Sequence, residues 1–246
     1  MVVQVILVHG IRTSASMWRA QAEYLTARGN GVTAVDLPGH GSRMDEEFTL
    51  EGAFATIDDA VQDAATRGPV LLVGHSMGGL LCIEYAGSEA NPPVAGFIAA
   101  SCTSIPRGAG LAAYRLLTRA FDSLPDRGMS LTNRMLDRIL PDETRADFGA
   151  GGYSLDNQHT ALASLSVLDL LAALERIDVP LWFVNGQFDQ LRINERLFLQ
   201  VAKHAELVVV PRTTHHVTVM RPAVFNAMLN LAIVTLDQAS RGIVDP

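Results

Sequence analysis

The stretch VLLVGHSMGG at residues 70–79 places Ser76 among small residues where an apolar run ends. Gly74 and Gly78 stand two positions away on either side, and their missing side chains leave room for a tight turn between a strand and a helix. Such a turn would expose the serine hydroxyl at the carboxyl end of a sheet, where open α/β sheets hold their ligands. The pattern therefore predicts a nucleophile rather than an ordinary loop.

A serine hydroxyl is a weak nucleophile near neutral pH and needs a neighbouring base. The segment PRTTHHVTVMRP, which follows the last apolar run, offers His215 and His216. A loop in this place can reach back over the sheet edge toward Ser76. His75, although it is adjacent to the serine, is expected to face away in a tight turn. The residues alone leave both His215 and His216 as candidates for the base.

The base in turn needs a carboxylate that orients its imidazole ring. Asp189, in VNGQFDQL, follows the penultimate apolar run and is the predicted carboxylate. Asp36 also ends an apolar run and is the competing candidate. Its setting, DLPGHG, is rich in proline and glycine and is more typical of a shaped structural loop.

These side chains require a scaffold that brings the ends of several strands together. Most of the short apolar runs lack polar alternation, as parallel strands covered on both faces do. Helix-like patterns lie between them, and the alternation predicts a doubly wound, mostly parallel α/β sheet of six strands. The six runs are VVQVILV (2–8), VTAVD (32–36), PVLLVG (69–74), VAGFIAA (94–100), PLWFVNG (180–186) and ELVVVP (206–211).

One long segment interrupts this alternation after the fourth run. We expect residues 103–178 to form a helical cap inserted into a core made of 1–102 and 179–246, because a structureless loop of that length is implausible. Apolar stripes on the cap helices predict an apolar pocket beside Ser76. The candidate helices are 110–122, 129–139 and 157–175, with a glycine-rich break at 149–152.

Five short motifs occur in an order that resembles the α/β-hydrolase superfamily, in its serine-nucleophile branch. They are VHG (8–10), DLPGHG (36–41), GHSMGG (74–79), NGQFD (185–189) and a histidine before MRP (220–222). The predicted sheet has no hairpin before its first strand. In this respect it resembles the sheet of the short-sheet branch, which includes plant esterases and hydroxynitrile lyases.

The resemblance implies roles for particular residues. It implies the chain order Ser76, Asp189, His215 for the nucleophile, the orienting acid and the base. Relatives commonly carry the histidine seven positions before a proline, which selects His215 over its neighbour. The resemblance also implies an oxyanion hole made by the backbone N–H groups of Ile11 and Met77.

The expected function is that of a carboxylesterase-like serine hydrolase, which cleaves a small, largely apolar ester through an acyl-enzyme. Acyl thioesterase, C–C bond hydrolase and cofactor-free haloperoxidase chemistry are alternatives on the same three residues. A non-catalytic ligand-binding protein is a less favoured reading. Hydroxynitrile lyase is also less favoured, because such lyases tend to carry Thr where Gly10 stands and Lys where His216 stands.

Composition restricts the partners. The net charge of -7, without a block of Lys or Arg, argues against nucleic acid as a partner, and no apolar run is long enough to cross a membrane. The apolar start is expected to be a strand rather than a signal peptide. Cys82 and Cys102 are expected to be free thiols in the cytoplasm. No cofactor or metal is expected, and the sequence carries no signal for an oligomeric state.

Overall fold

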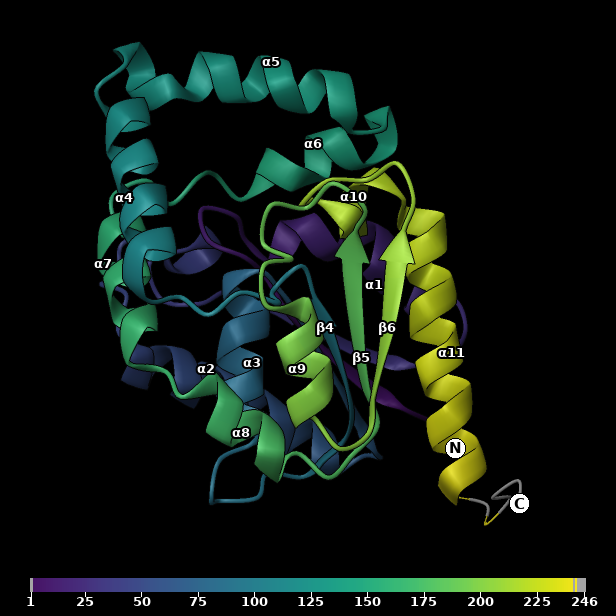
Figure 1. The fold of residues 1–246 in the computed structure, drawn as a ribbon. Helices are drawn as coiled ribbons and strands as arrows, with labels where there is room; N and C mark the ends of the chain where they lie inside the picture. Colours follow the sequence, from purple (N-terminus) through teal and green to yellow (C-terminus); the bar gives the residue numbers. More distant parts are fainter. Residues whose placement is uncertain (1, 241, 243–246) are drawn as a thin grey trace.

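The computed structural model describes residues 2–240 and 242, and its centre is a single sheet of six parallel strands. The strand order is β2-β1-β3-β4-β5-β6, and the carboxyl ends of the strands point the same way (Figure 1). The predicted parallel α/β sheet is confirmed. The strands are β1 (Gln4–Val8), β2 (Gly31–Val35), β3 (Val70–His75), β4 (Val94–Ala100), β5 (Leu181–Gly186) and β6 (Ala205–Val210).

The central strands owe their place to continuous apolar sequence. Every residue of β1, β3 and β5 is buried, whereas most residues of the two edge strands β2 and β6 are partly exposed. Strand β3 lies between β1 and β4, and Gly74 is paired with Val8 on one side and Ala99 on the other. The end of β3, where the predicted nucleophile follows, is therefore held from both sides.

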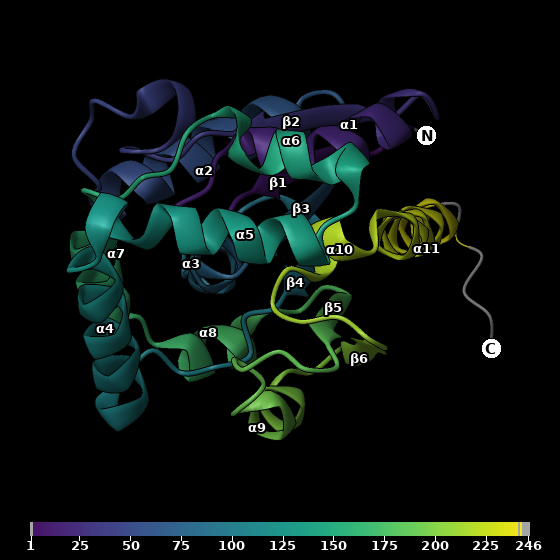
Figure 2. The same cartoon turned by 90° about the horizontal axis from the view of Figure 1, so that it is seen from above.

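Helices cover both faces of the sheet and bury two separate cores (Figure 2). One core contains side chains of α2, α3, α8 and α9, and the other contains side chains of α1 and α11. Thr49 caps the start of α2, where its hydroxyl accepts a hydrogen bond from Gly52 N–H at 3.0 Å. These helices are α1 (Arg19–Thr26), α2 (Leu50–Ala65), α3 (Met77–Ala86), α8 (Leu170–Arg176), α9 (Glu195–Val201) and α11 (Pro222–Ser240).

The segment between β4 and β5 is helical, and we call its helices α4 to α8 the helical insertion. Helix α5 crosses above the carboxyl ends of the strands, as both ribbon views show (Figures 1 and 2). Besides α8, the insertion contains α4 (Gly108–Asp122), α5 (Met129–Ile139), α6 (Asp142–Ala150) and α7 (Gln158–Ser164). The other short elements are α10 (Val217–Met220) and the 3-10 turns Ala15–Trp18, Gly41–Arg43, Pro125–Gly128 and Leu165–Val167.

The insertion differs in detail from the expected helices. The predicted helix 157–175 is interrupted, because Leu168 adopts an extended backbone and Asp169 a non-helical one. Its second half, α8, packs against α3 beside the sheet rather than over the strand ends. The predicted glycine-rich break contains the end of α6, and Gly152 there has φ +79°. The division into a core and a cap stays a prediction.

Within the described part of the chain, no helix combines the length and the apolar character needed to cross a membrane.

Candidate active site

The turn between β3 and α3 holds Ser76 in a strained conformation. Its φ of +53° and ψ of -120° are rarely adopted by a residue with a side chain. A Cβ atom at Gly74 would lie 2.6 Å from the carbonyl oxygen of Gly78, and one at Gly78 would clash with the carbonyl oxygens of Val8 and His9. The two glycines therefore let the helix start directly against β1 and β3, and the serine stands at the apex.

Three predicted side chains from three different loops meet at this turn. The hydroxyl of Ser76 donates to Nε2 of His215 at 2.8 Å, and Nδ1 of His215 donates to Oδ1 of Asp189 at 3.1 Å. This pattern requires the tautomer that carries its proton on Nδ1. The arrangement can deprotonate the serine hydroxyl and stabilise the imidazolium that forms.

The carboxylate of Asp189 is buried, since its side chain has 0% exposure. Burial disfavours its charged form, but hydrogen bonds from His215 and from the N–H of Leu191, the latter at 2.8 Å, hold its pKa below the usual range. The group therefore stays ionised beside the imidazole. A buried carboxylate with these donors can fix the orientation of the histidine ring.

His75 contacts the loop that carries the candidate base. Its Nε2–H donates to the backbone carbonyl of His215 at 2.9 Å, and the two rings lie 5.1 Å apart. Burial and the neighbouring His215 lower its pKa to about 3, so the ring is neutral. His75 thus supports the loop of the candidate base. The adjacency of His75 to Ser76 gave no signal for this contact.

The competing residues have other contacts. His216 packs edge-on against Phe148 at a ring distance of 5.1 Å, and burial keeps its pKa well below the usual value. The Asp36 carboxylate accepts hydrogen bonds from the N–H groups of Ala15 and Ser42, at 2.7 and 2.9 Å. Among the described residues, neither His216 nor Asp36 forms a hydrogen bond with Ser76.

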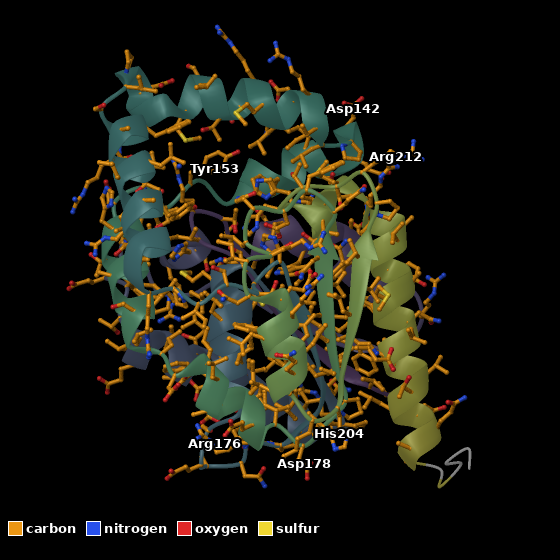
Figure 3. The ribbon with its side chains drawn as sticks, in the orientation of Figure 1. Asp142, Tyr153, Arg176, Asp178, His204 and Arg212 are labelled. Carbon is orange, nitrogen blue, oxygen red and sulfur yellow. The ribbon has the colours of Figure 1, made fainter. Side chains whose placement is uncertain are left out.

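The remaining histidines serve local structure. His9 accepts a hydrogen bond from the N–H of Leu37 at 3.1 Å and thereby links the ends of β1 and β2. His159 pairs with Asp122 within the helical insertion. His204 lies beside Asp178 at the opposite end of the molecule from Tyr153 and α5 (Figure 3). In the described residues, no three or more His, Cys, Asp and Glu side chains gather as a metal site.

Two cavities open beside Ser76, and Ile11 and Tyr114 line both of them. The small cavity has a volume of about 90 Å³ and an apolar wall that includes Met77, Leu80, Cys102, Leu111, Leu162 and Leu165. The large cavity has a volume of about 420 Å³ and is lined by residues that include Arg12, Thr132, Phe148, Tyr153, His215 and His216. Ser76 therefore lies where the two cavities meet.

The N–H groups of Ile11 and Met77 are free to bind a ligand. Neither donates a backbone hydrogen bond within the described residues. Met77 is the first residue of α3, so its N–H points out of the helix at the positive end of the helix dipole. Both residues line the small cavity together with Ser76.

The fold and the site define a protein of the α/β-hydrolase class. A family model described as "Alpha/beta hydrolase family" matches residues 5–228, so the chain belongs to this family. The resemblance of the five motifs is thereby confirmed.

Individual curated relatives match only part of the chain. Esterase PIR7B from Oryza sativa subsp. japonica is 34% identical over 46% of this chain and 44% of its own length. The chain spans less than half the length of the curated relatives it matches first, 39% of one and 44% of the other.

Solved structures match over nearly the whole chain. A thermophilic esterase from Thermogutta terrifontis matches with a TM-score of 0.74 and 19% sequence identity. The match covers 96% of this chain and 90% of the esterase chain. A bromoperoxidase from Bacillus anthracis has a TM-score of 0.77 and 17% identity, over 95% and 92%. At this identity the likeness concerns the fold.

Proposed function

We propose that the protein is a carboxylesterase-like serine hydrolase whose substrate is an ester of a short apolar acid. The observation that carries the proposal is the hydrogen-bonded series from Ser76 through His215 to the buried Asp189. The fold family and the esterase names of several relatives support the reaction class.

The first half-reaction forms an acyl-enzyme. Ser76 Oγ attacks the ester carbonyl carbon while His215 Nε2 accepts the hydroxyl proton, and the carbonyl oxygen becomes an oxyanion. The N–H groups of Ile11 and Met77 are its proposed donors. The C–O bond then breaks, and the alcohol leaves with the proton that His215 returns.

The second half-reaction releases the acid. A water molecule gives a proton to His215 and adds to the acyl carbonyl, and the same two N–H groups stabilise the second oxyanion. Collapse of this intermediate breaks the bond to Ser76, whose Oγ regains the proton from the imidazolium. The enzyme is restored, and one ester and one water have become an acid and an alcohol.

The two cavities suggest how the ester is oriented. His215 lines the large cavity and not the small one. Because His215 must give its proton to the departing alcohol, the alcohol belongs on the large-cavity side. The acyl group then enters the small cavity, whose volume of about 90 Å³ is below the roughly 150 Å³ of an apolar cavity that accepts benzene.

The proposal is tested with the variant Ser76→Ala and a panel of 4-nitrophenyl esters and acyl thioesters of increasing acyl length. The wild type should prefer short acyl chains, and Ser76→Ala should lose on the order of 10⁶-fold in kcat with folding intact. A fluorophosphonate should label the wild type and not the variant. Retention of even a tenth of the activity by Ser76→Ala would refute the assignment, and faster turnover of thioesters would redirect it to thioesterase chemistry.

A further inference from the structure

Arg12 follows the proposed oxyanion donor Ile11 directly and lines the large cavity. Its backbone has φ +65°, and its carbonyl oxygen accepts a hydrogen bond from the N–H of Ser154 at 3.2 Å. The N–H of Thr13 returns to Gly10 O at 3.4 Å and closes the turn. A built turn therefore fixes the origin of the Arg12 side chain next to the nucleophile.

The guanidinium of Arg12 forms no ion pair with another described residue. Within the described residues no carboxylate lies within 4.0 Å of it, and its one hydrogen bond goes to the sulfur of Met129 at 3.6 Å. Partial burial lowers its pKa, but an arginine remains charged in proteins. A partly buried cation with five N–H donors and one weak acceptor gains most when an anion joins it.

The surroundings of Arg12 suit an anion. No Asp or Glu is found among the described residues that line the large cavity. Tyr114 and Tyr153 line the same cavity. Outside the cavity wall, the carboxylate of Asp122 attracts the charge of Arg12, but the guanidinium of Arg127 repels it. Tyr153 lies below α5 on the inner side of the helical insertion (Figure 3). Tyr114 makes no side-chain hydrogen bond with another described residue, so its hydroxyl is free to donate.

We propose that Arg12 is a specificity-determining residue that binds an anionic group on the alcohol part of the substrate. This inference rests on the proposed ester hydrolysis, because the side of the cleaved alcohol is defined by the proton that His215 must deliver. The substrate is then an ester that joins a short apolar acid to an alcohol with a carboxylate or a phosphate. The sequence-based expectation of an apolar pocket applies to the small cavity alone.

An anion site at Arg12 would also account for the difference between the two cavities. An acyl group in the small cavity meets an almost wholly apolar wall, whereas the alcohol meets a cation. A planar guanidinium can hold a carboxylate by two parallel hydrogen bonds, which fixes direction as well as distance. The ester would thereby be set in one orientation before the serine attacks.

The test compares two chromogenic butyrate esters, one of 4-nitrophenol and one of 5-hydroxy-2-nitrobenzoate, which adds a carboxylate to the same leaving group. The measured quantity is the ratio of kcat/KM for the anionic ester to kcat/KM for the neutral ester. Arg12→Gln should lower this ratio by roughly 10- to 100-fold, mainly through KM. Arg12→Lys should lower it less, because it keeps the charge and loses the planar fork.

The matched control is Arg134→Gln, which removes the charge of an exposed arginine on α5 that does not line the cavity. Its ratio should stay within about twofold of the wild type. A binding measurement separates the two proposals: calorimetry of 5-hydroxy-2-nitrobenzoate with Ser76→Ala, with and without Arg12→Gln. Loss of Arg12 should raise the Kd at least about tenfold.

Each outcome has one meaning. If the esters are hydrolysed and the ratio is the same in the wild type and both Arg12 variants, the role of Arg12 is overturned and the hydrolase proposal stands. If the wild type hydrolyses neither ester, the calorimetry shows whether Arg12 forms an anion site. An Arg12-dependent Kd then supports the anion site without the esterase function, and an unchanged Kd overturns both.

Discussion

At the scale of single residues, the proposed mechanism depends on the charge of one buried carboxylate. Asp189→Asn would preserve the size of the side chain but present an amide to His215, which can then rotate or adopt the wrong tautomer. We expect kcat of the folded protein to fall roughly 10⁴-fold. Steady-state kinetics with a 4-nitrophenyl ester measures the loss.

Asp36→Asn is the control for this variant. It weakens the hydrogen bonds from Ala15 and Ser42, so it should lower the unfolding temperature while its folded fraction still turns over. A nearly normal Asp189→Asn enzyme would mean that another acid orients the base.

The two adjacent histidines provide a second test at this scale. His215→Ala should lose kcat to about the same extent as Ser76→Ala, because the residues act as one unit. His216→Ala removes a ring that packs on Phe148 and lines the large cavity, so it should change KM and alter kcat less than about tenfold. Severe and equal losses in both variants would contradict the assignment of the base to His215.

At the scale of elements, the position of Ser76, the proposed nucleophile, depends on how closely α3 approaches β1. Gly78→Ala would place a Cβ atom against the carbonyl oxygens of Val8 and His9, which are backbone atoms and cannot rotate away. We expect the free energy of unfolding to fall by roughly 1–3 kcal/mol, and the activity of the folded protein to fall as Ser76 shifts. Urea unfolding and ester hydrolysis measure the two effects.

Gly110→Ala is the control for stability alone, because a Cβ atom there meets nothing within 4 Å inside α4, but Gly110 lines the small cavity. It should raise the free energy of unfolding by about 0.5–1 kcal/mol, because alanine favours a helix over glycine. Equal stability of the two variants would show that the close approach at Gly78 is not required.

Some features of the elements around the site could be predicted from the sequence, and others could not. Strand β3 and the glycines around Ser76 were predictable, because a continuous apolar run and missing Cβ atoms are local properties. The contact of His75 with the carbonyl of His215 was not, since it joins residues 140 positions apart and depends on where one loop ends. Arg12 was missed for a similar reason: its lack of an ion pair with another described residue is a property of the folded cavity.

At the scale of the whole molecule, several buried histidines couple stability to pH. Burial lowers the pKa of His9 and His75 to about 3 and also lowers the pKa of His216 and His40, whereas histidines in the unfolded chain titrate near 6.5. Between these values the unfolded chain binds more protons than the native protein, so stability rises with pH and is lost on acidification. The lowered pKa values of Asp36 and Asp189 act in the same direction at lower pH, and the raised pKa of Glu84 opposes them.

The free energy of unfolding should therefore fall steeply from pH 6 to pH 4.5, by up to about 1.4 kcal/mol per pH unit for each histidine that stays neutral in the folded protein. Against a total stability of roughly 5–15 kcal/mol, this change is large enough to unfold the protein in mild acid. Urea unfolding at several pH values measures the slope. His9→Gln keeps an acceptor for the N–H of Leu37 and should reduce the slope by up to about 1.4 kcal/mol per pH unit. A free energy of unfolding that stays constant over this range would show that His9 and His75 take up protons within the folded protein.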